Sequence, residues 1–297
     1  MQPGAQRRIA VLALFLGVTG IGFAPLLVRM SEVGPSATAF YRLLFALPFI
    51  WFWMHREQVR APEKRSPATA RDFLHLALAG LLFVADLSIW HWSLLYTSVA
   101  NSTLLTNLAP VFVTVGGIFI FGEKPTRLFV AGMVIGLIGA VLLVSESLNL
   151  RREHLLGDVL ALVAALFYSG YLLSVKNLRK SFSGPTLLAW SGLVSCPGFL
   201  LVAICSREKL VPVHTSGWMV VIALAMFSHV GGQTLIAYAF GHLPASLTSL
   251  GLLWQPVVAG VLAWIFLHEA LSWIQIAGGL VVLVGLAIAN RAETKTG

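Results

Sequence analysis

Several ionisable and amide side chains of this sequence stand inside long apolar stretches. Arg42 lies in one stretch and Asp86 in the next, while His229 and Gln233 lie in a later one. Because residues four apart share one face of a helix, His229 and Gln233 are expected side by side. Polar groups in such surroundings are costly, which makes them candidates for binding or for carrying a proton. A guanidinium and a carboxylate together would suit the two charges of a zwitterion.

Each of these groups also has a structural interpretation. Arg42 and Asp86 could form an ion pair that locks two helices together, and His229 could be a hydrogen-bonded core histidine. If a proton is carried, Asp86 and His229 are the candidates, because imidazole titrates near neutral pH and a buried carboxyl group can be held protonated. The sequence leaves these alternatives open.

Two prolines, Pro110 and Pro256, lie near the middle of apolar stretches, and Asn107 and Gln255 stand close to them. A proline inside a helix removes one backbone hydrogen bond, which predicts either a hinge or a fixed kink at both places. Aromatic side chains expected in the interior, as the wall of a cavity or as helix packing, are Tyr41, Trp90, Tyr168, Trp190 and Trp254.

The elements that position these residues follow from composition. The 297 residues are 58% hydrophobic and 11% charged, with a mean hydropathy of +0.85, whereas soluble domains carry about 25% charged residues. Because lipid offers the backbone no hydrogen-bond partners, each apolar stretch is expected to form a helix. We therefore predict an all-α integral membrane protein with ten transmembrane helices, at 9–30, 34–54, 72–96, 99–121, 127–145, 155–175, 184–205, 216–240, 245–267 and 273–290. The longest loop is expected from His55 to Arg71.

The positive charges predict the orientation in a cell (inner) membrane. With both termini in the cytoplasm, most of the 20 Lys and Arg residues fall in cytoplasmic loops or tails, as the positive-inside rule requires. The opposite side then holds Arg29, Arg151, Arg152, Arg207 and Lys209, and Arg42 lies inside a helix.

A repeat with an offset of 146 residues divides the chain. Pro110 corresponds to Pro256, Glu123 to Glu269, Gly132 to Gly278 and Gly139 to Gly285. We predict two five-helix halves, 1–150 and 151–297, and since five is odd, the second half must enter the membrane inverted. Inverted repeats are typical of secondary transporters, which open a central site alternately to each side. The two glutamates are expected to share a structural task, such as bonding the start of a neighbouring helix.

Motifs in both halves resemble those of the EamA family in the drug/metabolite transporter (DMT) superfamily, and the overall pattern is similar to YddG-type amino-acid exporters. The resemblance implies a central cavity lined by both halves and export of small amino acids or metabolites. Leu94 departs from the family pattern, which often has Ala there. The residues that carry the resemblance are Trp92–Asn101, Ala109, Pro110, Glu123, Gly132 and Gly139 in the first half, and Tyr238, Leu243–Ser246, Gln255, Pro256, Glu269, Gly278 and Gly285 in the second.

Other classes of protein find less support. The chain has no phosphate-binding loop and no clustered metal ligands, so we expect no enzyme activity, no cofactor and no metal. Its basic residues form no continuous stripe, which argues against nucleic acid as a partner. The remaining alternatives are an uptake or exchange carrier for another metabolite, drug or nucleotide-sugar, and a channel or structural membrane protein. The expected partners are a small-molecule substrate and the lipid bilayer, and one copy suffices to enclose a site.

Overall fold

The computed structural model describes residues 3–60, 66–145, 148, 152–267 and 271–294. Within them, ten helical segments are long and apolar enough to cross a membrane, which confirms the predicted number of spans. The spans are Ala5–Arg29, Pro35–Arg60, Ala70–Tyr96, Asn101–Phe121, Arg127–Val144, Leu155–Leu178, Gly184–Cys205, Thr215–His242, Ala245–Phe266 and Trp273–Ala292.

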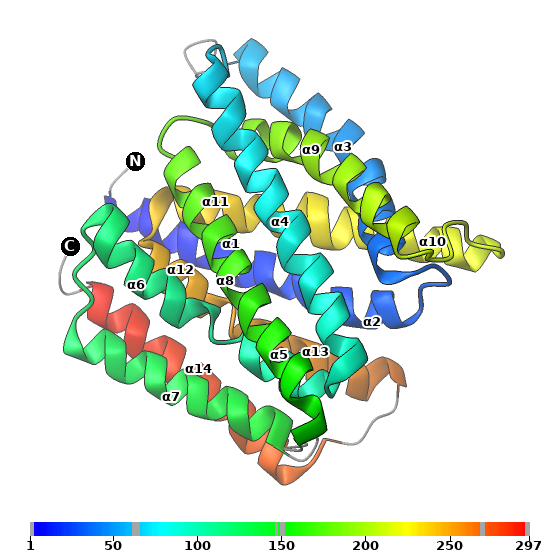
Figure 1. Cartoon of the computed structure of the whole chain (residues 1–297). Coiled ribbons are helices and arrows are strands. Elements are labelled where there is room, and N and C mark those ends of the chain that lie inside the picture. Colours follow the sequence, from blue (N-terminus) through cyan, green and yellow to red (C-terminus); the bar gives the residue numbers. More distant parts are fainter. Residues whose placement is uncertain (1–2, 61–65, 146–147, 149–151, 268–270, 295–297) are drawn as a thin grey trace. The chain divides into compact units, whose positions relative to one another are not determined.

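Several spans contain more than one helical element, labelled in Figure 1. Span one breaks after Gly22, spans four and nine break near their middle, and span eight contains a π-helix, η3. The elements are α1 Pro3–Gly22, α2 Ala24–Arg29, α3 Pro35–Arg60, α4 Ala70–Tyr96, α5 Val99–Thr106, α6 Ala109–Phe121, α7 Arg127–Val144, η2 Arg152–His154, α8 Leu155–Leu178, α9 Gly184–Cys205, α10 Thr215–Ala223, η3 Leu224–Gln233, α11 Thr234–His242, α12 Ala245–Gly251, α13 Trp254–Leu267 and α14 Trp273–Thr294.

The expected loop from His55 to Arg71 is wrong at both ends. Helix α3 continues to Arg60 and α4 begins at Ala70. Residues 55–60 include Arg, Glu and Gln, which are good helix formers, so a helix leaving the apolar stretch can extend into polar surroundings. Hydropathy predicts which residues lie in lipid, but a helix can continue beyond those residues.

The two prolines lie at the start of new helical elements. Pro110 is the second residue of α6 and Pro256 the third residue of α13. In the first turn of a helix the missing amide of proline costs no intrahelical hydrogen bond. Both prolines therefore sit where a span is already interrupted.

The chain forms two compact units, and each draws on both halves of the sequence. Unit 1 comprises Met1–Ser88 and Ser174–His242, and unit 2 comprises Ile89–Leu173 and Leu243–Gly297. Helices α4 and α8 each contribute to both units. The two compact units therefore do not coincide with the two halves of the sequence.

Unit 2 is built on close packing between α7 and α14, which lie side by side (Figure 1). A Cβ added at Gly132 would lie 2.7 Å from the Gly285 carbonyl oxygen, and one at Gly139 would lie 2.8 Å from that of Gly278. We call these four glycines the glycine seam. Its pairing shows that α7 and α14 run antiparallel. Since the repeat maps α7 onto α14, equivalent helices run in opposite directions, as inverted halves require.

Unit 1 packs α3 against α9, and α1 against η3 and α11. The contact of α1 is also close, because a Cβ at Gly17 would lie 2.9 Å from the Gly232 carbonyl oxygen and the reverse distance is the same. The Ser228 hydroxyl donates to the Gly20 carbonyl at 3.0 Å. Small residues of α1 therefore hold the π-helix in place.

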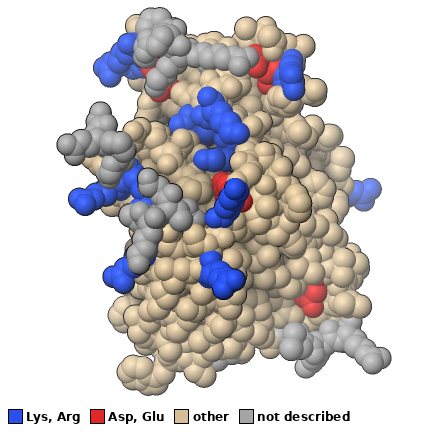
Figure 2. Space-filling model, turned by 90° about the vertical axis from the view of Figure 1, so that its left-hand side faces the viewer, with Lys and Arg blue, Asp and Glu red and all other residues tan. Residues whose placement is uncertain are grey.

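The surface agrees with a bilayer as the surrounding solvent. Large apolar side chains such as Phe119 and Leu201 are exposed, which is expected where lipid covers the protein. On the face drawn in Figure 2, the Lys and Arg side chains stand in separate groups among apolar and neutral residues. That face carries no continuous basic stripe among the residues described.

Candidate functional site

Four of the candidate residues lie buried in unit 1. Arg42 on α3 is 8% exposed, Asp86 on α4 is 6% exposed, and His229 and Gln233 on η3 are 2% and 7% exposed. We call these four residues the polar cluster. All of them belong to segments long and apolar enough to span a membrane.

The structure brings part of the polar cluster together. Helix α3, which carries Arg42, packs against η3, which carries His229. The ring of Phe83 on α4 lies 6.4 Å from the His229 ring, measured between centroids. Asp86 follows Phe83 by three residues, so it lies on the same face of α4. The direct pairing of Arg42 with Asp86 stays a prediction.

His229 is the most distinctive member of the polar cluster. Both of its ring nitrogens are buried and have no hydrogen-bond partner among the described residues. The hydroxyl oxygens of Ser88 and Thr234, in the same unit, are in the same condition. Buried polar atoms are normally hydrogen-bonded, and in a membrane span such groups mark candidate pathways for substrates or protons.

The π-helix η3 is a local feature that the sequence did not reveal. It runs from Leu224 to Gln233 and carries both His229 and Gln233. A π-helical turn is wider than an α-helical turn, is rare, and occurs frequently at functional sites. The sequence signals that come closest are Gly231 and Gly232, which are poor helix formers.

In unit 2 the candidate amides lie at the breaks of spans four and nine. Asn107 caps the C-terminus of α5, and its buried side-chain nitrogen has no hydrogen-bond partner among the described residues. Trp254 and Gln255 are the first two residues of α13. Broken helices near the middle of a span expose backbone groups to a binding site in many transporters.

The candidate aromatic residues are dispersed. Tyr41 and Trp190 belong to unit 1, and Trp90 and Tyr168 belong to unit 2. Their ring partners, with centroid distances, are Trp218 for Tyr41 at 5.2 Å, Phe73 and Trp51 for Trp190 at 5.0 and 5.2 Å, His91 for Trp90 at 5.3 Å, and Tyr171 for Tyr168 at 6.4 Å. Packing between aromatic rings thus accounts for a contact of each of these four residues.

Glu123 performs the structural task expected of it. Its two carboxylate oxygens accept hydrogen bonds from the amides of Ala245 and Ser246, at 2.6 and 3.1 Å. These amides begin α12, so Glu123 satisfies donors that the helix itself leaves unpaired. The counterpart Glu269 lies outside the described residues.

Comparison with known proteins supplies the family. The sequence profile of the EamA-like transporter family matches the chain twice, over residues 8–145 and 155–291. The chain belongs to the EamA-like transporter family. The two matches cover nearly the whole chain, which confirms the resemblance and the two-repeat architecture. An EamA-like protein is a transporter and not an enzyme.

Relatives along the full length agree with this assignment. An uncharacterized transporter of Archaeoglobus fulgidus is 23% identical, with 95% of this chain and 97% of the relative covered. A probable amino-acid metabolite efflux pump of Salmonella typhimurium is 25% identical, with 95% of each chain covered. One solved crystal structure superposes with a TM-score of 0.78 at 20% identity, covering 96% of this chain and 98% of the other, and it supports the fold alone.

Proposed function

We propose that this EamA-like transporter exports small zwitterionic metabolites, with neutral or aromatic amino acids as its main substrates. The observation that carries the proposal is the burial of the Arg42 guanidinium and the His229 ring on two elements that pack together, α3 and η3. The ring nitrogens of His229 have no partner among the described residues. A buried cation in a membrane span attracts an anion strongly, and the carboxylate of an amino acid is a small anion of suitable geometry. The name of the Salmonella relative supports the same substrate class.

The mechanism we propose is alternating access between the two inverted repeats. The substrate carboxylate contacts Arg42, its ammonium group contacts Asp86, and His229 and Gln233 donate or accept further hydrogen bonds. The breaks ahead of Pro110 and Pro256 act as hinges. Tyr41, Trp90, Asn107, Tyr168, Trp190, Trp254 and Gln255 line the central cavity in this proposal.

The coupling proposal concerns protons. Asp86 and His229 are the candidate proton carriers of the polar cluster, because imidazole titrates near neutral pH and a buried carboxyl group can be held protonated. Export driven by the proton gradient then needs one of them to be protonated on one side of the membrane only. Transport by a His229→Gln variant that keeps the full pH dependence of the wild type would remove His229 from this role.

The test of the substrate class is counterflow in liposomes. The purified full chain is reconstituted into liposomes preloaded with unlabelled amino acids, and uptake of labelled leucine, phenylalanine and threonine is followed. We expect saturable accumulation that falls at least ten-fold in Arg42→Gln, since a charged hydrogen bond contributes about 1.5–3 kcal/mol. Arg56→Gln is the matched control, because Arg56 lies on the same helix, exposed over the Phe52 ring.

Two outcomes would overturn the proposal. Folded wild-type protein that accumulates no amino acid would exclude this substrate class and favour another metabolite, drug or nucleotide-sugar. Flux without counterflow would indicate a channel.

The orientation is a separate proposal. We infer that the chain lies in the inner membrane with both termini in the cytoplasm and that a single copy is functional. A reporter that fluoresces only in the cytoplasm, fused after Gly297, is expected to be bright, and a periplasmic phosphatase fused there is expected to be inactive. The reverse pattern would invert the topology.

A further inference from the structure

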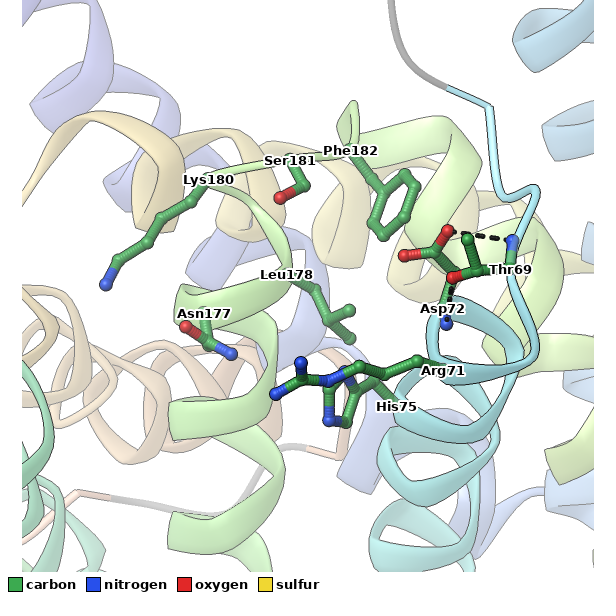
Figure 3. Close-up of a pocket in the computed structure, with 9 residues that line it drawn as sticks. All are labelled: Thr69, Arg71, Asp72, His75, Asn177, Leu178, Lys180, Ser181 and Phe182. Carbon is green, nitrogen blue, oxygen red and sulfur yellow. Dashed lines mark hydrogen bonds between the residues drawn. The ribbon is translucent and has the colours of Figure 1, made fainter.

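A second candidate site lies at one end of unit 1, and none of its residues belongs to the polar cluster. It is a pocket with a volume of about 300 Å³ between the start of α4 and the turn that follows α8 (Figure 3). Because α4 begins at Ala70 and α8 ends at Leu178, both at the limits of their spans, the pocket lies where lipid meets water. Its lining residues are Thr69, Arg71, Asp72, His75, Asn177, Leu178, Lys180, Ser181 and Phe182.

Hydrogen-bond donors predominate on one side of this pocket. Arg71 and Lys180 contribute positive charges, and both are exposed enough to meet a ligand. In Figure 3 the Arg71 guanidinium extends toward Asn177 with the His75 ring beside it. Arg71 and His75 are four residues apart on α4, so they share a face. Guanidinium, ammonium and amide groups together form the donor set that proteins use for phosphate.

The acidic residue of the pocket is already engaged. One oxygen of the Asp72 carboxylate accepts from the amides of Thr69 and Ala68, at 3.1 and 3.3 Å. The Thr69 hydroxyl accepts in return from the Asp72 amide at 3.2 Å. This reciprocal arrangement caps the N-terminus of α4. The carboxylate is thus held by the backbone, and in Figure 3 it lies on the Phe182 side of the pocket.

The wall formed by the turn after α8 is well ordered by hydrogen bonds. The amides of Ser181 and Phe182 both donate to the Leu178 carbonyl, at 3.0 and 2.8 Å. Arg179 ties this turn to α11, because its Nε donates to the Ala237 carbonyl at 2.8 Å. The Phe182 side chain is buried and lines the pocket. The backbone of this wall is therefore held in place by its own hydrogen bonds.

An apolar stripe leads away from the pocket along α4. Leu74, Leu78 and Leu81 are exposed and recur at helical spacing, so they form one lipid-facing line. Arg71 precedes Leu74 by three residues and stands at the polar end of the same line. A molecule with a phosphate at the pocket and hydrocarbon along α4 would contact both features.

We propose that this pocket binds a phosphate-bearing anion, namely the headgroup of an acidic phospholipid, with its acyl chains along the leucine stripe. Free phosphate esters carry the same phosphate group as the headgroup, but they have no acyl chains to contact the leucine stripe. Basic pockets between membrane helices are suited to anionic headgroups. The proposal is independent of the transported cargo.

The test measures lipid binding to the purified full chain by native mass spectrometry. The probes are phosphatidylglycerol, phosphatidylcholine, inorganic phosphate and glycerol phosphate at matched concentrations. We expect phosphatidylglycerol to bind more tightly than phosphatidylcholine, and Arg71→Gln to weaken its binding roughly five-fold, with a further loss of similar size when Lys180→Gln is added. Arg127→Gln is the matched control, since Arg127 is also an exposed arginine at the start of a span.

The outcomes separate the sources of the anion. Tight binding of glycerol phosphate, weakened by Arg71→Gln, would assign the pocket to free phosphate esters and keep the anion site. Equal binding of the two lipids, or equal loss in Arg71→Gln and Arg127→Gln, would overturn the proposal. Arg71→Lys, which retains the charge, is expected to recover most of the binding and so to separate charge from folding defects.

Discussion

The glycine seam of unit 2 and the polar cluster of unit 1 are both buried between helices, but the seam consists of backbone contacts and the cluster consists of polar and ionisable side chains. In the seam, backbone meets backbone and no side chain intervenes between Gly139 and Gly278. In the polar cluster, ionisable side chains occupy the interior, and His229 has no hydrogen-bond partner among the described residues. Close backbone contact stabilises a fold, whereas buried groups without partners cost stability and are retained for another reason. The difference fits an architectural role for the seam and the role in transport that we propose for the cluster.

The largest effect is expected at the glycine seam, where two adjacent glycines of α14 provide a matched pair. A Cβ at Gly278 would lie 2.7 Å from the Leu143 amide nitrogen, whereas the nearest atom to a Cβ at Gly279 is a Val257 methyl at 3.5 Å. We expect Gly278→Ala to destabilise the protein by about 3 kcal/mol, because backbone cannot move aside. Gly279→Ala should be neutral or slightly stabilising, since alanine favours helix.

Denaturant unfolding in detergent measures both variants, and counterflow normalised to folded protein measures their transport. Equal stability of Gly278→Ala and Gly279→Ala would show that the seam is less tight than the structure indicates. Loss of transport per folded molecule in Gly278→Ala would show that the seam takes part in transport as well as in architecture.

The next largest effect is expected from His229→Leu. Removing a buried polar ring without a partner should raise stability by about 1 kcal/mol, while loss of a substrate or proton contact should reduce transport about ten-fold. Unfolding midpoint and counterflow are measured on the same preparation. A decrease in stability would instead identify His229 as a structural histidine, the alternative that the sequence left open.

A smaller effect is expected at Glu123. Glu123→Gln retains the shape of the side chain but removes the charge that accepts from the amides of Ala245 and Ser246, and should cost about 1 kcal/mol. The repeat predicts a similar loss for Glu269→Gln. Unequal losses in the two unfolding curves would show that the two halves do not use these glutamates alike.

The smallest effect concerns pH at the surface of unit 1. The amide of His214, together with the amide of Val213 and the His214 ring, lowers the pKa of Glu32 below its ordinary value. A carboxyl group with a lowered pKa stabilises the folded contact above its ordinary pKa, near 4.5, and this contribution is lost as pH falls through the folded value. Protection of the Val213 and His214 amides from hydrogen exchange should therefore decrease below about pH 4.5.

Glu32→Gln is the control for this pH dependence. It should lower the protection at neutral pH and remove its dependence on pH, because glutamine does not titrate in this range. A wild type and a Glu32→Gln variant with the same acid-induced loss would place the titrating group elsewhere.

Much of the fold could be predicted because membrane helices obey simple rules. Each apolar stretch must satisfy its own backbone, so length and hydropathy alone located ten spans to within a few residues. The repeat of Gly132 and Gly139 at Gly278 and Gly285 predicted an inverted second half, and the antiparallel seam agrees with it. The structural role of Glu123 also followed from its symmetric position.

The candidate site could be predicted only in part. Sequence marks a polar residue in an apolar stretch, which singled out Arg42 and His229, but it does not say which helices pack together. The packing of α3, which carries Arg42, against η3, which carries His229, depends on side chains far apart in the chain. The sequence also left open whether Trp190 lines a cavity or packs between helices, and the structure has it packed against Phe73 and Trp51.

By itself, the sequence determined the membrane environment, the number of spans, the repeat and the membership of the EamA-like family, because these depend on local composition and on spacing along the chain. Tertiary structure alone decided that the compact units mix both halves, that span eight contains a π-helix, and that α4 and the turn after α8 enclose a basic pocket. These features arise from packing between distant segments, which fixes backbone geometry and brings charges together in ways that local sequence does not encode.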